Sequence, residues 1–243
     1  MPSSSNADRD PRLEAGSALD TATLNQRHVG IALLAMSMIV LDGFDLQVLA
    51  FAAPSILAEW GITRADLAPI FASGMVGVAI GGLLVGPRGD VWGRKPALLG
   101  SAVFFGLATL ASAWAQTETQ LLVLRLIAGI GLGGALTNAT ALVVETAPLR
   151  WRPVLTMTTM VGVPVGGFIG GLLAARLIPA FGWESVFVVG GVLPVVLAGA
   201  LWIWLPESAR FLLRAGRREE ANAAVNALLG ENRFAPADAV WLA

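Results

Sequence analysis

The sequence contains no cysteine and no tyrosine, and only 14% of its 243 residues are charged. The lack of cysteine excludes cysteine nucleophiles, zinc–thiolate sites and disulfide scaffolds. Since a soluble domain normally has about 25% charged residues, the low charge argues against a soluble enzyme. The net charge of −1 gives no support for binding to nucleic acid. What the chain does contain is 56% hydrophobic residues and 28 glycines, which is typical of a multi-pass membrane protein.

Six apolar stretches are long enough to cross a bilayer as helices, because about 30 Å of hydrocarbon requires roughly 20 helical residues. Strands are not expected, since the stretches do not alternate and are twice the length of a barrel strand. The six stretches are 29–58, 67–86, 96–115, 121–144, 153–175 and 185–205. We therefore predict an all-α membrane protein with six transmembrane helices in a bundle over residues 28–206.

Polar segments flank the predicted bundle. Residues 1–27 lack an apolar core, so we expect a disordered cytoplasmic tail and neither a signal peptide nor a transit sequence. Apolar residues with helical spacing follow the bundle at Ala221, Ala224, Val225 and Leu228. With Gly230 as a C-terminal stop, they predict one short amphipathic helix within a cytoplasmic segment 207–243, near the membrane surface or beneath the bundle.

The basic residues predict the orientation, because positively charged loops stay on the cytoplasmic side. Thirteen of the 16 lysines and arginines fall before the first stretch or after the second, fourth and sixth. They are Arg9, Arg12, Arg27, Arg88, Arg94, Lys95, Arg150, Arg152, Arg210, Arg214, Arg217, Arg218 and Arg233. Both termini are therefore expected on the cytoplasmic side.

Two acidic residues, Asp42 and Asp45, interrupt the first apolar stretch, and their spacing places them on one face of a helix. An ionised carboxylate at the centre of a membrane costs about 2.5–3.5 kcal/mol on insertion scales. Two carboxylates this close also repel each other, which favours proton uptake by one of them. The pair predicts a proton relay or ion site facing the bundle interior. The alternative is that one acid pairs with a cation for packing alone.

A single charge, Arg125, lies in the fourth stretch, at a depth of roughly 6–8 Å from the outer side. Its side chain either extends to the membrane interface or faces inward, where its planar guanidinium can bind a carboxylate. The glycine-rich sequence that follows favours the inward orientation. Glycines spaced for close helix contacts are Gly129, Gly131, Gly133, Gly162, Gly166 and Gly170. Glycine faces also allow helices to slide, and packing alone explains any one pair equally well.

The loop between the second and third stretches reads GPRGDVWGRK over residues 86–95 and combines one acid, turn glycines and a basic pair. A second charged set, Glu145, Arg150 and Arg152, follows the fourth stretch. Charges in adjacent inner loops can form a latch that breaks when helices move. The alternative for Arg94 and Lys95 is a role in membrane orientation alone.

These motifs resemble those of the major facilitator superfamily. The loop motif G-x-x-x-D-x-x-G-R-[KR] is matched by Gly86, Asp90, Gly93, Arg94 and Lys95, and the motif R-x-x-x-G-x-G by Arg125, Gly129 and Gly131. The sequence DGFD at 42–45 is similar to a signature of aromatic acid:proton symporters. The resemblance implies the N-terminal half-bundle of a major facilitator fold, made of two inverted three-helix repeats.

The resemblance also implies a function: proton-coupled import of a hydroxybenzoate-like carboxylate across a bacterial inner membrane by alternating access. Asp42 and Asp45 would handle the proton, and Arg125 would couple to them or to the substrate. No cofactor besides the proton, no metal and no nucleic acid is implied. A missing second six-helix half or second chain is expected to be needed. The alternatives are a carrier for a sugar or another organic acid, and a truncated fragment that does not transport.

Overall fold

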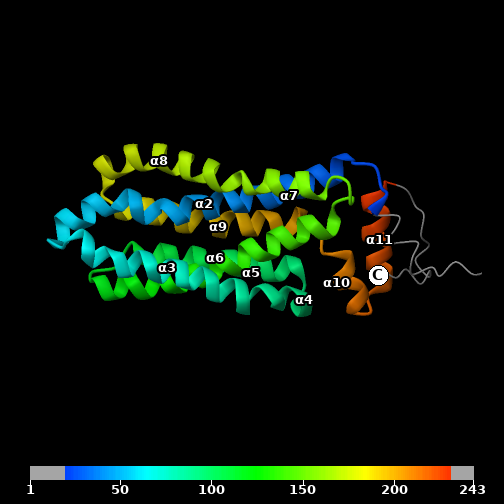
Figure 1. Ribbon diagram of the computed structural model, residues 1–243, viewed down its shortest axis with the longest axis horizontal. Helices are drawn as coiled ribbons and strands as arrows, with labels where there is room; N and C mark the ends of the chain where they lie inside the picture. Colours follow the sequence, from blue (N-terminus) through cyan, green and yellow to red (C-terminus); the bar gives the residue numbers. More distant parts are fainter. Residues whose placement is uncertain (1–19, 231–243) are drawn as a thin grey trace, which may run out of the picture.

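The computed structural model describes residues 20–230 as a bundle of long helices (Figure 1). Six segments of this part of the chain are long and apolar enough to cross a membrane, and they coincide with the six predicted stretches. They are α2 (Gln26–Trp60), α3 (Arg64–Leu84), α5 (Arg94–Ser112), α6 (Glu118–Thr146), α7 (Arg152–Met160) together with α8 (Gly162–Phe181), and α9 (Glu184–Trp204). The prediction of an all-α membrane protein with six spans is confirmed.

Short helices lie at the end of the bundle where α2 begins (Figure 1). The 3-10 helix η1 (Gly86–Arg88) and helix α4 (Gly89–Trp92) connect α3 to α5. Helices α10 (Ala209–Arg214) and α11 (Arg218–Leu229) follow α9. Helix α11 contains the predicted amphipathic pattern, whereas α10 was not predicted.

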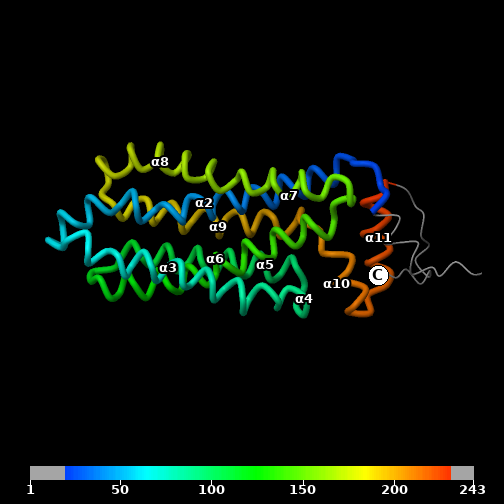
Figure 2. Tube along the Cα trace, viewed as in Figure 1, coloured from blue at the N-terminus to red at the C-terminus, as the bar shows by residue number. Residues whose placement is uncertain are grey.

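The fifth span is divided at Val161, where α7 ends and α8 begins. Pro164 explains the division, because it has no N–H to donate to the carbonyl four residues earlier, that of Met160. The sequence predicted a single apolar stretch over residues 153–175 here. The tube in Figure 2 shows α7 and α8 following each other alongside α2.

Glycines allow the helices to approach closely at the predicted positions. A Cβ atom on Gly166 of α8 would collide with the carbonyl oxygen of Val40 in α2, and one on Gly133 of α6 would collide with that of Val78 in α3. Gly131 faces α5, where an added Cβ would lie 2.7 Å from the Cβ of Phe105. An added Cβ would also collide at Gly129, with the Gly74 carbonyl oxygen, and at Gly170, with the Phe44 ring. At Gly162 it would make a tight contact of 3.1 Å with the Met36 carbonyl oxygen.

Two buried apolar clusters fill the bundle along its length. One includes Met38, Leu98 and Phe105, and the other includes Leu121 and Phe187. The first cluster also contains residues of α11, so this short helix packs against the bundle.

The segment before α2 differs from the disordered tail expected up to residue 27. The Asp20 carboxylate lies 3.0 Å from Arg152 Nη2, and the Asp20 carbonyl accepts a hydrogen bond from the Leu149 N–H. The Asn25 side chain caps α2 and donates to the Leu228 carbonyl oxygen of α11 at 2.5 Å. These bonds fix the start of α2 to the α6–α7 connection and to α11, so residues 20–27 are held against the bundle. The rest of the predicted tail with Arg9 and Arg12, and the stretch 231–243 with Arg233, lie outside the described residues.

Candidate functional site

Asp45 and Arg125 form a buried ion pair between α2 and α6. Arg125 Nη1 lies 3.3 Å from Asp45 Oδ1 and 3.4 Å from Oδ2. Both side chains are 5% exposed. Of the two orientations considered from the sequence, the guanidinium therefore has the inward one and does not extend to the end of the bundle.

Two hydroxyl groups of α5 complete this pair. Thr109 Oγ1 donates to Asp45 Oδ1 at 2.6 Å and accepts from Arg125 Nη2 at 3.0 Å. Ser112 Oγ accepts from the same Nη2 at 3.0 Å. The guanidinium carbon also lies 5.1 Å from the ring centre of Phe187 in α9. Four helices thus hold one charge pair, with hydrogen bonds that offset part of its desolvation, while Arg125 Nε is buried without a partner among the described residues.

Thr109, Ser112 and Phe187 were not among the site residues predicted from the sequence. The available signal was weak, because two hydroxyl residues three positions apart in an apolar stretch share a helix face wherever they occur. Only the packing of α5 against α6 shows that this face meets Arg125.

Asp42 lies one helical turn before Asp45 and is 1% exposed. Neither of its carboxylate oxygens has a hydrogen-bond partner among the described residues. Burial without a partner penalises the ionised carboxylate. The two predicted acids are therefore in contrasting environments: Asp45 has a cation and a hydroxyl, and Asp42 has neither.

A small hollow of about 60 Å³ opens beside the ion pair, between α2, α3 and α6. Asp45 and Arg125 reach it, and the rest of its lining is apolar, including Leu49, Phe71 and Met75. An apolar wall with one cation and one acid is suited to an apolar molecule that carries a carboxylate.

The predicted loop residues meet at the other end of the bundle, around Arg94 at the start of α5. Arg94 Nη2 lies 2.5 Å from Asp90 Oδ1 and 2.9 Å from Glu145 Oε1, and Nε donates to the same Glu145 oxygen at 3.0 Å. Arg94 Nη1 donates to Asn138 Oδ1 at 3.4 Å. The structure thus brings three of the predicted charges together.

The segment between α9 and α10 adds two residues that were not among the predicted site residues. Ser208 donates a hydrogen bond to the Glu145 carboxylate, and Glu207 Oε1 accepts one from the Lys95 backbone N–H at 3.2 Å. Gly93 has a φ of 103°, a conformation that a residue with a Cβ rarely adopts, and its surroundings include the Glu207 carboxylate. One polar cluster, called the Arg94 cluster below, therefore joins the start of α5, the end of α6 and the start of α10.

Three other predicted loop residues lie outside this cluster. Gly86 packs against the Thr137 side chain, Arg152 pairs with Asp20, and Arg150 is exposed. The predicted second charged set is thus divided: Glu145 lies within α6 and contacts Arg94, whereas Arg150 and Arg152 follow Ala147, where α6 has already ended.

The arrangement of the six spans is that of one half of a major facilitator. The structure superposes on the proton:xylose symporter XylE with a TM-score of 0.74 and 23% identity, covering 84% of this chain and 50% of that chain. A partially occluded inward-open structure of XylE from E. coli gives a TM-score of 0.72, with 23% identity over 84% of this chain and 56% of that chain. At this identity the likeness defines the fold.

The chain belongs to the sugar (and other) transporter family, whose sequence pattern matches residues 31–239. It is 42% identical to the 4-hydroxybenzoate transporter PcaK of Pseudomonas putida, over 84% of this chain and 46% of that protein. It is 45% identical to the gallate transporter of the same species, over 84% of this chain and 45% of that protein. The chain spans about half the length of the curated relatives it matches, and it is a membrane transporter homologue rather than an enzyme.

Proposed function

We propose that the chain forms the first half of a carrier that imports an aromatic carboxylate together with a proton by alternating access. The observation that carries this proposal is the pairing of Arg125 with Asp45, at the edge of an apolar hollow and one turn from Asp42, which has no hydrogen-bond partner within residues 20–230. Similarity to transporters named for 4-hydroxybenzoate and gallate supports an aromatic substrate.

The charge pair suggests how the substrate and the proton are coupled. A substrate carboxylate that reaches Arg125 through the hollow competes with Asp45 for the guanidinium. Asp45 then loses its cation, and a buried carboxylate without a cation binds a proton more readily. Asp42, one turn away, passes the proton to or from Asp45. Anion and proton thus enter together, which keeps the net charge of the buried site constant.

The hydrogen bonds and ion pairs of the Arg94 cluster must break when the carrier opens to the cytoplasm. Its bonds join the ends of α5, α6 and α10. Breaking them frees these ends to separate. This role requires the cluster and both termini to be cytoplasmic, as the distribution of basic residues indicates.

A second six-helix half is needed to close the transport path, because substrate sites of this fold lie between two related halves. The half is supplied either by further residues of the same polypeptide or by a second chain. The hollow at Asp45 then becomes one wall of a larger site.

Uptake measurements test the proposal. Cells that express the chain with a six-helix second half should accumulate labelled 4-hydroxybenzoate, and Asp42→Asn and Asp45→Asn should abolish accumulation. Labelled xylose serves as the comparison. Uptake of xylose with no uptake of 4-hydroxybenzoate would favour a sugar carrier, and uptake of neither would favour a fragment that does not transport.

A further inference from the structure

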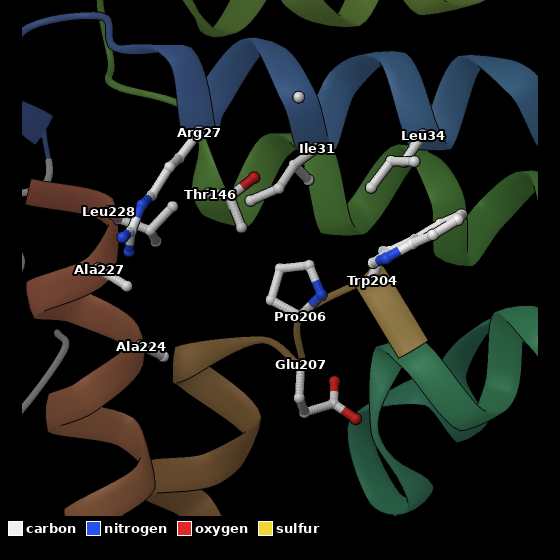
Figure 3. Close-up of a pocket in the computed structure, with 11 residues that line it drawn as sticks. Arg27, Ile31, Leu34, Thr146, Trp204, Pro206, Glu207, Ala224, Ala227 and Leu228 are labelled. Carbon is white, nitrogen blue, oxygen red and sulfur yellow. The ribbon is translucent and has the colours of Figure 1, made fainter. Parts of the chain in front are cut away.

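A second cavity lies far along the bundle from the Asp45–Arg125 pair, at the end where α2 begins (Figure 3). Its volume is about 310 Å³, within the range of small-molecule sites. Residues from α2, α6, α9 and α11 and from the segment after α9 line it. Its walls are mainly apolar, with Ile31 and Leu34 on one side and Pro206 and Ala224 on the other. None of the residues assigned to substrate or proton lines it.

Of the described residues that line this cavity, Arg27 is the one basic residue. Its side chain is exposed, and its guanidinium makes no hydrogen bond or ion pair within residues 20–230. Glu207 also lines the cavity, but its Oε1 already accepts hydrogen bonds from the Lys95 and Ser208 N–H groups. Figure 3 shows the Glu207 side chain pointing away from Arg27, toward the start of α5. Among residues 20–230, the cavity therefore has one positive charge that no carboxylate neutralises.

Trp204 lines the cavity at the end opposite Arg27 (Figure 3), and its side chain is 67% exposed. Trp202, two residues earlier, lies near Lys95, whose Nζ is 5.6 Å from the ring centre. Tryptophans at the end of a span, beside basic residues, mark the level of the lipid headgroups. The cavity thus lies where a headgroup and the first part of an acyl chain meet.

We propose that this cavity binds one anionic phospholipid of the cytoplasmic leaflet, with its phosphate at Arg27 and the start of an acyl chain along Ile31, Leu34 and Pro206. The apolar walls favour a lipid over a free phosphate, and the unneutralised Arg27 favours an anionic headgroup over a zwitterionic one. Because the cavity joins α2 to α11, the bound lipid stabilises the position of α11 against the bundle. This inference goes beyond the proposed transport and needs only the membrane orientation.

Native mass spectrometry of the purified full chain tests this site, with phosphatidylglycerol and phosphatidylethanolamine as probes. We expect one phosphatidylglycerol to bind more tightly than phosphatidylethanolamine. Arg27→Gln should weaken phosphatidylglycerol about fivefold, the effect of one basic residue near an anionic surface. Arg27→Lys, which keeps the charge, should retain most of the binding. Ala224→Trp should fill the cavity and abolish binding, whereas Ala223→Trp, on the exposed face of α11, should not.

Three results would overturn the proposal. Equal binding of the two lipids would mean that Arg27 does not select the headgroup. Unchanged binding in Ala224→Trp would place the lipid elsewhere. Full displacement by free glycerol 3-phosphate would mean that the apolar walls contribute nothing. If Ala224→Trp does not fold, the comparison of Arg27→Gln with Arg27→Lys decides, and equal binding in these two variants contradicts the proposal.

Discussion

Arg125 and Asp45 stand 80 positions apart in the chain, yet their side chains share two hydrogen bonds, of 3.3 and 3.4 Å, inside the bundle. Thr109 lies between them and bonds to both. The pair therefore links α2, α5 and α6 at the point where the apolar hollow opens. A charge pair in this place can stabilise the fold and also respond to a substrate, and these two roles can be measured separately.

Removing one member of the pair should destabilise the protein strongly. Arg125→Gln leaves Asp45 buried without a cation, so we expect the free energy of unfolding in detergent to fall by about 3–5 kcal/mol. The double variant Arg125→Gln/Asp45→Asn should recover much of that loss, because it leaves no buried charge behind. Arg64→Gln, at an exposed position with no ion pair among the described residues, is the control. Equal losses in the single and double variants would contradict the account.

Asp42→Asn should change the stability of the protein less than Asp45→Asn, because Asp45 bonds to Arg125 and Thr109. No hydrogen bond to a described residue is lost at Asp42, so the free energy of unfolding should change by less than about 0.5 kcal/mol or increase. Accumulation against a gradient should nevertheless be lost, while exchange of labelled for unlabelled substrate continues. Counterflow in proteoliposomes containing both halves measures this. Accumulation at the wild-type level in Asp42→Asn would remove Asp42 from the proton path.

Substitution of a packing glycine should separate α8 from α2. A Cβ on Gly166 collides with backbone atoms of Val40, which cannot move aside as a side chain can. We expect Gly166→Ala to cost about 1–3 kcal/mol in detergent stability, the usual range for overpacking. Gly100→Ala, where nothing lies within 4 Å of the added Cβ, is the matched control and should not destabilise. Similar melting temperatures for both variants would show that close packing at Gly166 is not required.

The spans and their charged residues could be predicted from the sequence, whereas their hydroxyl partners and the short helix α10 could not. The six spans were predictable because a bilayer requires about 20 apolar residues for each crossing, and this constraint is local. Asp42, Asp45 and Arg125 stood out because charges are rare within such spans. Thr109 and Ser112 did not stand out, since hydroxyl residues are common in membrane helices and gain a role only from the neighbour that packing brings. Helix α10 is too short for periodicity to show, and the division at Val161 depended on one proline.

The Arg94 cluster should act as a unit. Arg94→Lys cannot keep the bonds to Asp90, Glu145 and Asn138 together, because one ammonium group does not reproduce a planar guanidinium. We expect the transport rate to fall at least tenfold while substrate binding is retained. Glu145→Gln should have a similar effect, and the double variant should be little worse than either single one. Arg88→Lys, which affects an exposed side chain bonded to the Leu84 carbonyl, is the control.

The orientation can be tested by cysteine labelling, because the chain has no cysteine of its own. Thr119→Cys at the start of α6 and Ala223→Cys in α11 both place the thiol at exposed positions at opposite ends of the bundle. A membrane-impermeant maleimide added to intact cells should label Thr119→Cys and leave Ala223→Cys unlabelled until the cells are opened. The reverse pattern would place the Arg94 cluster and α11 outside the cell.

Uptake driven by a proton gradient tests directly whether the carrier couples an aromatic carboxylate to a proton. Proteoliposomes would contain this chain together with the second half of the Pseudomonas putida 4-hydroxybenzoate transporter PcaK, with that intact transporter as the positive control. The account predicts that an inward proton gradient drives accumulation of labelled 4-hydroxybenzoate, and that Asp42→Asn abolishes the accumulation. Accumulation of the same size without a gradient, or none at all while the control transports, would contradict it.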